Sequence, residues 1–316
     1  MVLPPGFAGS DAEPVRVEIT PIAPGLAVVV QLSLTEPYVG QQFTALYSLR
    51  AIHAPYAVDV DPQQYVGFWT EVVPLPEQGR SAQHFLNGVP ATDYLLRQVV
   101  AYPLYPGRME LPPLRVKVKR SAAGPEEWDL TSASQPVPLT VHPLPNFRGA
   151  GSTVPLVGDM DGSLEILGRG EKLEIALELY GTTNLAFFNP LQWLPKPDCC
   201  ELSVRLLLSE DSVRTRDMGG KREVFLFKRR RWSIKTVGRM EAGTRLGDFA
   251  IPVFQPRQSE WVMLRFTGAS RAGPSSERAA VGDLPRELPL NPTKSTPAFL
   301  LTWAHLLLAA AAARSR

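Results

Sequence analysis

One run of basic residues, Lys228 to Arg231 followed by Trp232, is the first candidate for chemistry in this sequence. Consecutive cations beside an aromatic ring could bind anionic groups, such as lipid head groups or the phosphates of a nucleic acid. A second basic cluster is not visible in the sequence. The preferred interpretation is therefore a solvated turn between two strands, with Trp232 folded back over the sheet. Arg229, Arg230, Arg231 and Trp232 are the predicted partner-binding residues.

Two short acidic motifs could suggest a calcium site. They are Asp159-Met160-Asp161-Gly162 and Asp59-Val60-Asp61-Pro62. An EF-hand loop needs a glycine at its sixth position and a glutamate at its twelfth, whereas Gly162 is fourth in its motif. Both motifs are predicted to be turns, the first leading into a strand over residues 163–167.

Catalytic and metal-binding patterns are weak throughout the sequence. The histidines occur singly, without metal-ligand spacing, at His53, His84, His142 and His305. The nucleophile elbow of hydrolases, the P-loop and the dinucleotide-binding glycine motif are all missing. The sequence therefore predicts a protein that is not an enzyme and that has no cofactor, no metal site and no catalytic residues.

The composition favours many short strands. Among 316 residues there are 31 prolines and 24 glycines, and 44% of the residues are hydrophobic, which is typical of strands separated by turns. The formal net charge of +2 provides no basic footprint for nucleic acid, so no nucleic-acid partner is expected. The two cysteines, Cys199 and Cys200, are adjacent, and neighbours on a strand point to opposite faces, so a disulfide between them is not expected.

A glycine-led strand pattern occurs twice. Gly40 precedes alternating apolar residues that begin at Phe43, and Gly170 precedes a similar series that begins at Leu173, with the two glycines 130 residues apart. A turn that feeds a strand of period two is typical of a β-sandwich. The repeat predicts two copies of one sandwich.

The predicted fold is all-β, with two tandem Ig-like β-sandwich domains followed by a linker and a C-terminal helix. The predicted boundaries are a leader over 1–14, domain 1 over 15–145, domain 2 over 146–267, a flexible linker over 268–297 and an apolar helix over 298–316. The linker is rich in Gly, Ser, Pro and charge.

The C-terminal segment is predicted to be a membrane anchor. Ala298 to Ala313 carries no charge, and Lys294, Arg314 and Arg316 flank it. It is slightly shorter than the roughly 20 residues of a typical spanning helix, so a docked helical tail is the alternative. The flanking arginines favour the cytoplasmic side, which leaves both sandwiches outside. Residues 1–24 show no signal peptide.

Several stretches resemble the BatD family of aerotolerance-operon (oxygen tolerance) proteins. The most similar is Arg97 to Leu114, which contains a tyrosine, Pro-Leu, a Pro-Gly turn and a Leu-Pro-Pro strand. Tyr38 to Leu49 resembles the opening strand pair of the family, Phe68 to Glu71 its aromatic strand, and Phe249 to Pro256 with Trp261 its last hairpin. Shorter pieces at 147–150, 157–158 and 163–165 resemble the join between its domains. The resemblance covers roughly residues 25–267.

The resemblance implies a single-pass protein of the bacterial cytoplasmic membrane with Ig-like domains in the periplasm. It also implies partners: von Willebrand A-domain membrane proteins and, indirectly, a MoxR-type AAA+ ATPase, in a complex for stress tolerance or envelope protein maturation. The alternative function is a carbohydrate- or surface-binding module that uses a row of exposed aromatic residues. The candidates for such a row are Trp69, Trp128, Trp193, Trp232 and Trp261.

Overall fold

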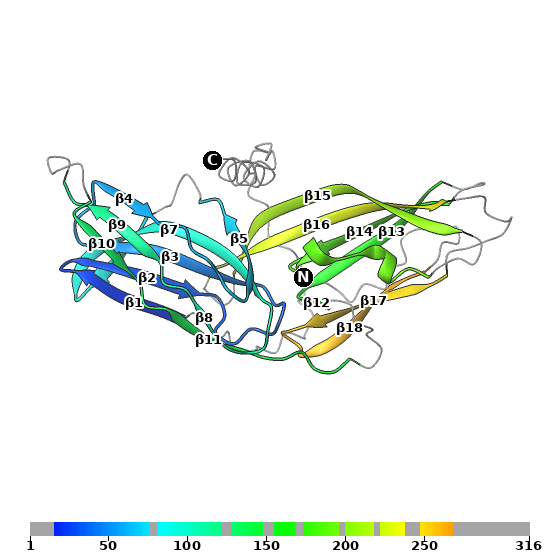
Figure 1. Cartoon of the computed structure of the whole chain (residues 1–316), viewed down its shortest axis with the longest axis horizontal. Helices are drawn as coiled ribbons and strands as arrows, with labels where there is room; N and C mark the ends of the chain where they lie inside the picture. The colour runs from blue at the N-terminus through cyan, green and yellow to red at the C-terminus, as the bar shows by residue number, and fades with distance from the viewer. Residues whose placement is uncertain are drawn as a thin grey trace, which may run out of the picture. The chain divides into compact units, whose positions relative to one another are not determined.

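The computed structural model describes residues 16–75, 81–121, 128–147, 155–168, 173–195, 200–217, 222–237 and 247–267. These residues form an all-β structure with several sheets, and their only helices are two short 3-10 helices (Figure 1). They all lie within one compact unit. We call residues 16–147 the N-terminal half and residues 155–267 the C-terminal half.

The strands of the N-terminal half form one large sheet and two small ones. The large sheet has the order β1-β2-β3-β7-β5, and β6 pairs with β7 off this path. The small sheets are β10-β9-β4 and β11-β8. The strand bounds are β1 Arg16–Ala23, β2 Leu26–Leu32, β3 Phe43–Ala51, β4 Ala57–Val60, β5 Phe68–Val73, β6 Ser81–Leu86, β7 Val89–Pro103, β8 Gly107–Leu111, β9 Arg115–Lys119, β10 Leu130–Ala133 and β11 Val137–Val141.

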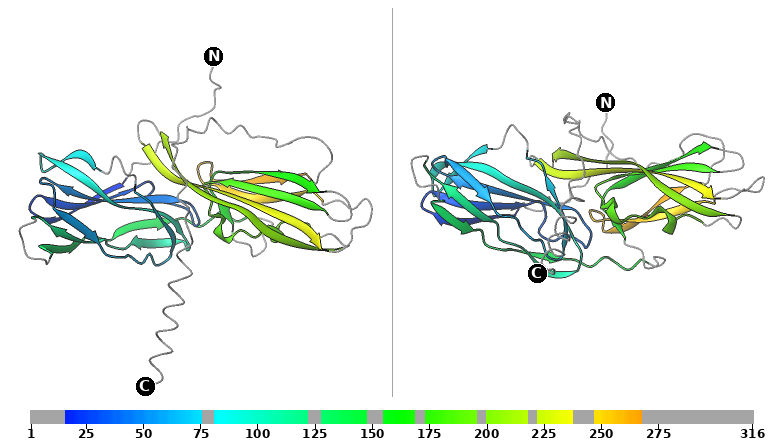
Figure 2. Two further views of the ribbon diagram at one scale, coloured as in Figure 1. Left: turned by 90° about the horizontal axis from the view of Figure 1, so that it is seen from above. Right: turned by 45° about the horizontal axis from the view of Figure 1, so that its top comes forward.

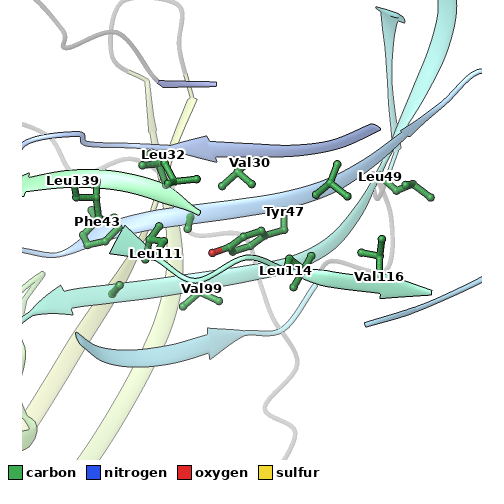
Figure 3. Close-up of a cluster of buried hydrophobic side chains, with 14 of the residues drawn as sticks. Val30, Leu32, Phe43, Tyr47, Leu49, Val99, Leu111, Leu114, Val116 and Leu139 are labelled. Atoms are coloured by element: carbon green, nitrogen blue, oxygen red, sulfur yellow. The ribbon is translucent and has the colours of Figure 1, made fainter. Parts of the chain in front are cut away.

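The core of the N-terminal half lies between the large sheet and the small sheets. Alternate residues of β3 enter it, among them Phe43, Tyr47 and Leu49. Figure 3 shows Tyr47 among Leu114, Leu111 and other aliphatic side chains. The Tyr47 side chain is fully buried, and burial is the main cause that raises the pKa of its hydroxyl.

The other face of β3 is buried as well. A strand at a sandwich surface normally alternates between buried and solvated residues. Thr44, Ser48 and Arg50 should then be solvated, yet they are 4%, 7% and 7% exposed. Arg50 forms a bidentate ion pair with Asp93 of β7 at 2.6 and 2.7 Å, and the pair is buried. Further structure must therefore cover the outer face of this sheet.

The C-terminal half contains a four-stranded sheet and a three-stranded sheet. The first has the order β13-β14-β16-β15 and the second β12-β17-β18. Figure 2 shows the same strands from two further directions. The bounds are β12 Leu156–Val157, β13 Met160–Gly168, β14 Glu174–Gly181, η1 Leu185–Phe187, η2 Pro190–Gln192, β15 Glu201–Asp217, β16 Arg222–Val237, β17 Phe249–Gln255 and β18 Glu260–Phe266.

The two halves share a strand order. Four strands run β2-β3-β7-β5 in the N-terminal half and β13-β14-β16-β15 in the C-terminal half, and all neighbours are antiparallel. In each set the third strand along the chain (β5 or β15) lies at the edge. The fourth strand (β7 or β16) then lies between it and the second. The predicted repeat strands, β3 and β14, occupy the same place in the two orders. Gly170 lies outside the described residues.

Most predicted strands are confirmed, and some bounds are corrected. β3 and β14 lie where the repeat predicts strands, and the predicted strand over 163–167 lies within β13. The predicted turn at 159–162 is wrong beyond Asp159, because β13 begins at Met160, and Asp59 and Val60 belong to β4.

The predicted leader (1–14), linker (268–297) and C-terminal apolar segment (298–316) all lie outside the described residues. Within the described part of the chain, none of the helices is long and apolar enough to cross a membrane. The membrane anchor stays a prediction.

Candidate functional site

The basic run lies in the middle of a strand, so the predicted turn is wrong. Lys228 to Trp232 belong to β16, which pairs with β14 on one side and β15 on the other. Trp232 is 5% exposed and packs in the core of the C-terminal half, against Phe188 at a centroid distance of 5.3 Å. It therefore does not fold back over the sheet surface.

Two arginines of the run point to one face of the sheet and are paired with carboxylates there. Arg229 contacts Glu178, and Arg231 contacts Glu165 at 2.7 Å. Glu178 also lies 3.8 Å from Arg231. The hydrogen bond to Glu178 is the main cause that raises the pKa of Arg229. These pairs are cross-strand pairs, which allow a charged sequence to remain in a sheet.

The alternate residues, Lys228 and Arg230, point to the opposite face, where both are buried and paired with carboxylates. Arg230 contacts Asp211 of β15 at 2.6 Å. The Lys228 side chain is only 1% exposed, and its ammonium lies between Asp211, at 3.5 Å, and Glu71 of β5. Glu71 belongs to the N-terminal half, so this cluster joins the two halves. We call Glu71, Asp211, Lys228 and Arg230 the charged cluster.

Two polar side chains of the N-terminal half bind the backbone of β16 next to the charged cluster. Gln42 accepts a hydrogen bond from the Leu226 amide at 2.7 Å, and its amide nitrogen lies 2.9 Å from the Leu226 carbonyl. The Thr44 hydroxyl donates to the Val224 carbonyl at 2.7 Å. The Gln42 amide nitrogen also donates to the Thr182 carbonyl and to the Tyr102 hydroxyl, both at 2.8 Å.

An apolar cluster completes the contact between the halves. Leu226 packs with Val73, Val100 and Tyr102 of the N-terminal half, and Val213 of β15 adjoins them. Tyr102 is 1% exposed. Burial is the main cause that holds the pKa of its hydroxyl well above the usual value, and Glu71 adds to it, so the hydroxyl is neutral at physiological pH.

A β-bulge in β15 determines which of its side chains face this contact. Its register against β16 shifts between Leu206 and Leu208. Because side chains alternate along a strand, one extra residue exchanges the two faces beyond it. The shift thereby places Asp211 and Val213, and not their chain neighbours, opposite Lys228 and Leu226.

The acidic motifs and the histidines also take part in internal contacts. Lys117 contacts Asp61 at 2.6 Å and Asp59 at 3.5 Å, and the Tyr180 hydroxyl lies 3.2 Å from Asp161. His142 contacts Glu36 at 3.1 Å. Within the described ranges, His, Cys, Asp and Glu side chains form no group of three or more that could hold a metal ion.

The five tryptophans of the predicted row do not form one exposed surface. Trp232 is buried, Trp193 packs partly buried against the same core, and Trp261 contacts Phe147 and Phe254. Trp69 and Trp128 are 36% and 39% exposed. A carbohydrate platform built from all five residues is therefore not supported.

The structure thus brings the four predicted residues into one strand and gives the three arginines internal carboxylate partners. Sequence reasoning missed Gln42, Thr44, Glu71 and Asp211, which complete the contact between the halves. Replacing Arg229, Arg230 and Arg231 with serine would remove ion-pair partners of Glu178 and Asp211, so we expect the replacement to affect folding. No protein-family model matches the chain, and no curated protein does either.

Proposed function

We propose that this chain is a non-enzymatic scaffold that binds other proteins through two tandem Ig-like β-sandwiches. In this proposal the C-terminal apolar segment anchors it in the bacterial cytoplasmic membrane and both sandwiches lie in the periplasm. Its partners are von Willebrand A-domain membrane proteins and, through them, a MoxR-type ATPase, as the resemblance to the BatD family implies.

The observation that carries the proposal is the strand order shared by the two halves. Two sets of four antiparallel strands with one order, each facing a second set of strands across a core, support tandem copies of one sandwich. Modules of this kind commonly present edges and loops to protein partners. The charged residues that first suggested chemistry are used in holding the protein together, which supports a structural role.

The sheet edges supply surfaces for such partners. β1 and β5 end the large sheet of the N-terminal half, and β13 and β15 end the four-stranded sheet of the C-terminal half. A strand at a sheet edge carries backbone groups that can pair with an added strand. The exposed apolar side chains Val72 of β5, at 68%, and Leu207 of β15, at 48%, lie on two of these edges.

Membrane fractionation tests the location that the proposal requires. We expect the full-length chain to sediment with membranes and to resist extraction by alkaline carbonate, as a spanning helix does. A matched variant that ends at residue 297 is expected to be released as a soluble protein. A full-length chain that remains soluble would contradict the proposal.

A further inference from the structure

The hairpin of β15 and β16 is much longer than the strand beside it. β15 has 17 residues and β16 has 16, whereas β14 has 8. β14 pairs with β16 only from Lys228 to Lys235. Residues 222–227 of β16 therefore extend beyond β14. The backbone N–H and C=O groups on that side of them form no hydrogen bonds to β14.

The N-terminal half satisfies this edge with side chains. Gln42 pairs with both the amide and the carbonyl of Leu226, and Thr44 donates to the carbonyl of Val224. These two side chains are two residues apart, as are their two partners, so they share one face or one edge of their strands. An unpaired strand edge can pair with another chain, and these three hydrogen bonds occupy backbone groups of this edge.

The same part of the hairpin buries a lysine that needs carboxylates from both halves. Lys228 is 1% exposed, with Asp211 on its own hairpin and Glu71 on β5. A buried ammonium with a single distant carboxylate would be poorly compensated. Removal of the N-terminal half would also expose Leu226, which is 6% exposed among apolar residues of β5 and β7.

We propose that the extension of the β15–β16 hairpin is a clamp that makes the two halves one cooperative unit. Gln42 and Thr44 form hydrogen bonds to its backbone, and Leu226 packs in the apolar contact. Glu71 and Lys228 form an ion pair between the halves. The halves then unfold together. This inference concerns the fold alone and stands whether or not the scaffold role is correct.

Calorimetry of the full-length chain in detergent measures the cooperativity. We expect the wild-type protein to unfold in one transition, with equal calorimetric and van't Hoff enthalpies. Leu226→Asp introduces a carboxylate into the apolar contact and is expected to divide this transition into two. Val237→Asp is the matched control, since Val237 lies on the same strand at 53% exposure, and it should retain one transition. Two transitions in the wild-type protein, or one in the folded Leu226→Asp variant, would overturn the clamp.

Hydrogen exchange gives a second test that does not depend on an introduced charge. Gln42→Met keeps the side-chain length but removes both groups that bind Leu226. We expect amide exchange over residues 224–228 to become at least about tenfold faster. The control is Gln41→Met, because Gln41 accepts a hydrogen bond from the Tyr38 amide within its own half. Unchanged exchange over 224–228 in a folded Gln42→Met variant would show that these bonds do not hold the hairpin.

Discussion

Asp93→Ala is expected to lower the free energy of unfolding by roughly 3–5 kcal/mol, because it leaves a buried guanidinium without its carboxylate. Asp93 and Arg50 are 5% and 7% exposed, and two hydrogen bonds join them. After the substitution Arg50 retains its contact with the Phe85 carbonyl at 3.3 Å. A single neutral acceptor does not compensate a buried charge. Denaturant unfolding monitored by circular dichroism at pH 8 measures the change.

The matched control for this prediction is Asp61→Ala. Asp61 contacts Lys117 at 2.6 Å, but both side chains are 30% exposed. Water can solvate Lys117 after the substitution, so we expect a much smaller loss of stability than for Asp93→Ala. Equal losses for the two variants would show that burial of the Arg50 pair does not matter.

Gly181→Ala is expected to cost at least about 3 kcal/mol, since both the backbone conformation and the space at this position exclude a side chain. Gly181 has a φ of +155°, and a Cβ there would lie 2.0 Å from the Asp159 carbonyl oxygen and 2.8 Å from the Met160 Cα. These contacts are with backbone, so β13 itself would have to move away from β14. Thermal and denaturant unfolding should both report the loss.

Gly88→Ala separates the two causes. Gly88 has a φ of +79° in the turn between β6 and β7, but beyond its chain neighbours no atom of the described residues lies within 4 Å of the position that a Cβ would take. Alanine should therefore cost only the backbone strain, about 1 kcal/mol. If Gly181→Ala were no worse than this control, the close packing of β13 on β14 would be incorrect.

The strands with alternating apolar residues could be predicted from the sequence, because burial on one face imposes a period of two. β11, over residues 137–141, follows this rule, because Val137, Leu139 and Val141 are buried and the residues between them are exposed. β3 did not reveal from its pattern that Thr44 and Arg50 are buried. Their burial depends on other parts of the chain, the β15–β16 hairpin and Asp93.

The sequence alone predicts a turn for the basic run, because the acids that pair with it lie on other strands. In register, Arg231 lies opposite Glu178, Arg229 opposite Glu210, and Lys228 opposite Asp211. The sequence contains these acids, but only the register brings them next to the cations. The bulge near Leu207 changes that register by one residue, and no local sequence pattern predicts the bulge.

Affinity purification of the full-length protein from solubilised membranes tests the proposed scaffold role most directly. Mass spectrometry should find a von Willebrand A-domain membrane protein in near-equal amount with the wild-type chain. The variant that ends at residue 297 should recover much less of it. Recovery of the wild-type chain alone from the membrane fraction, at any detergent and salt concentration that keeps it folded, would contradict the scaffold role.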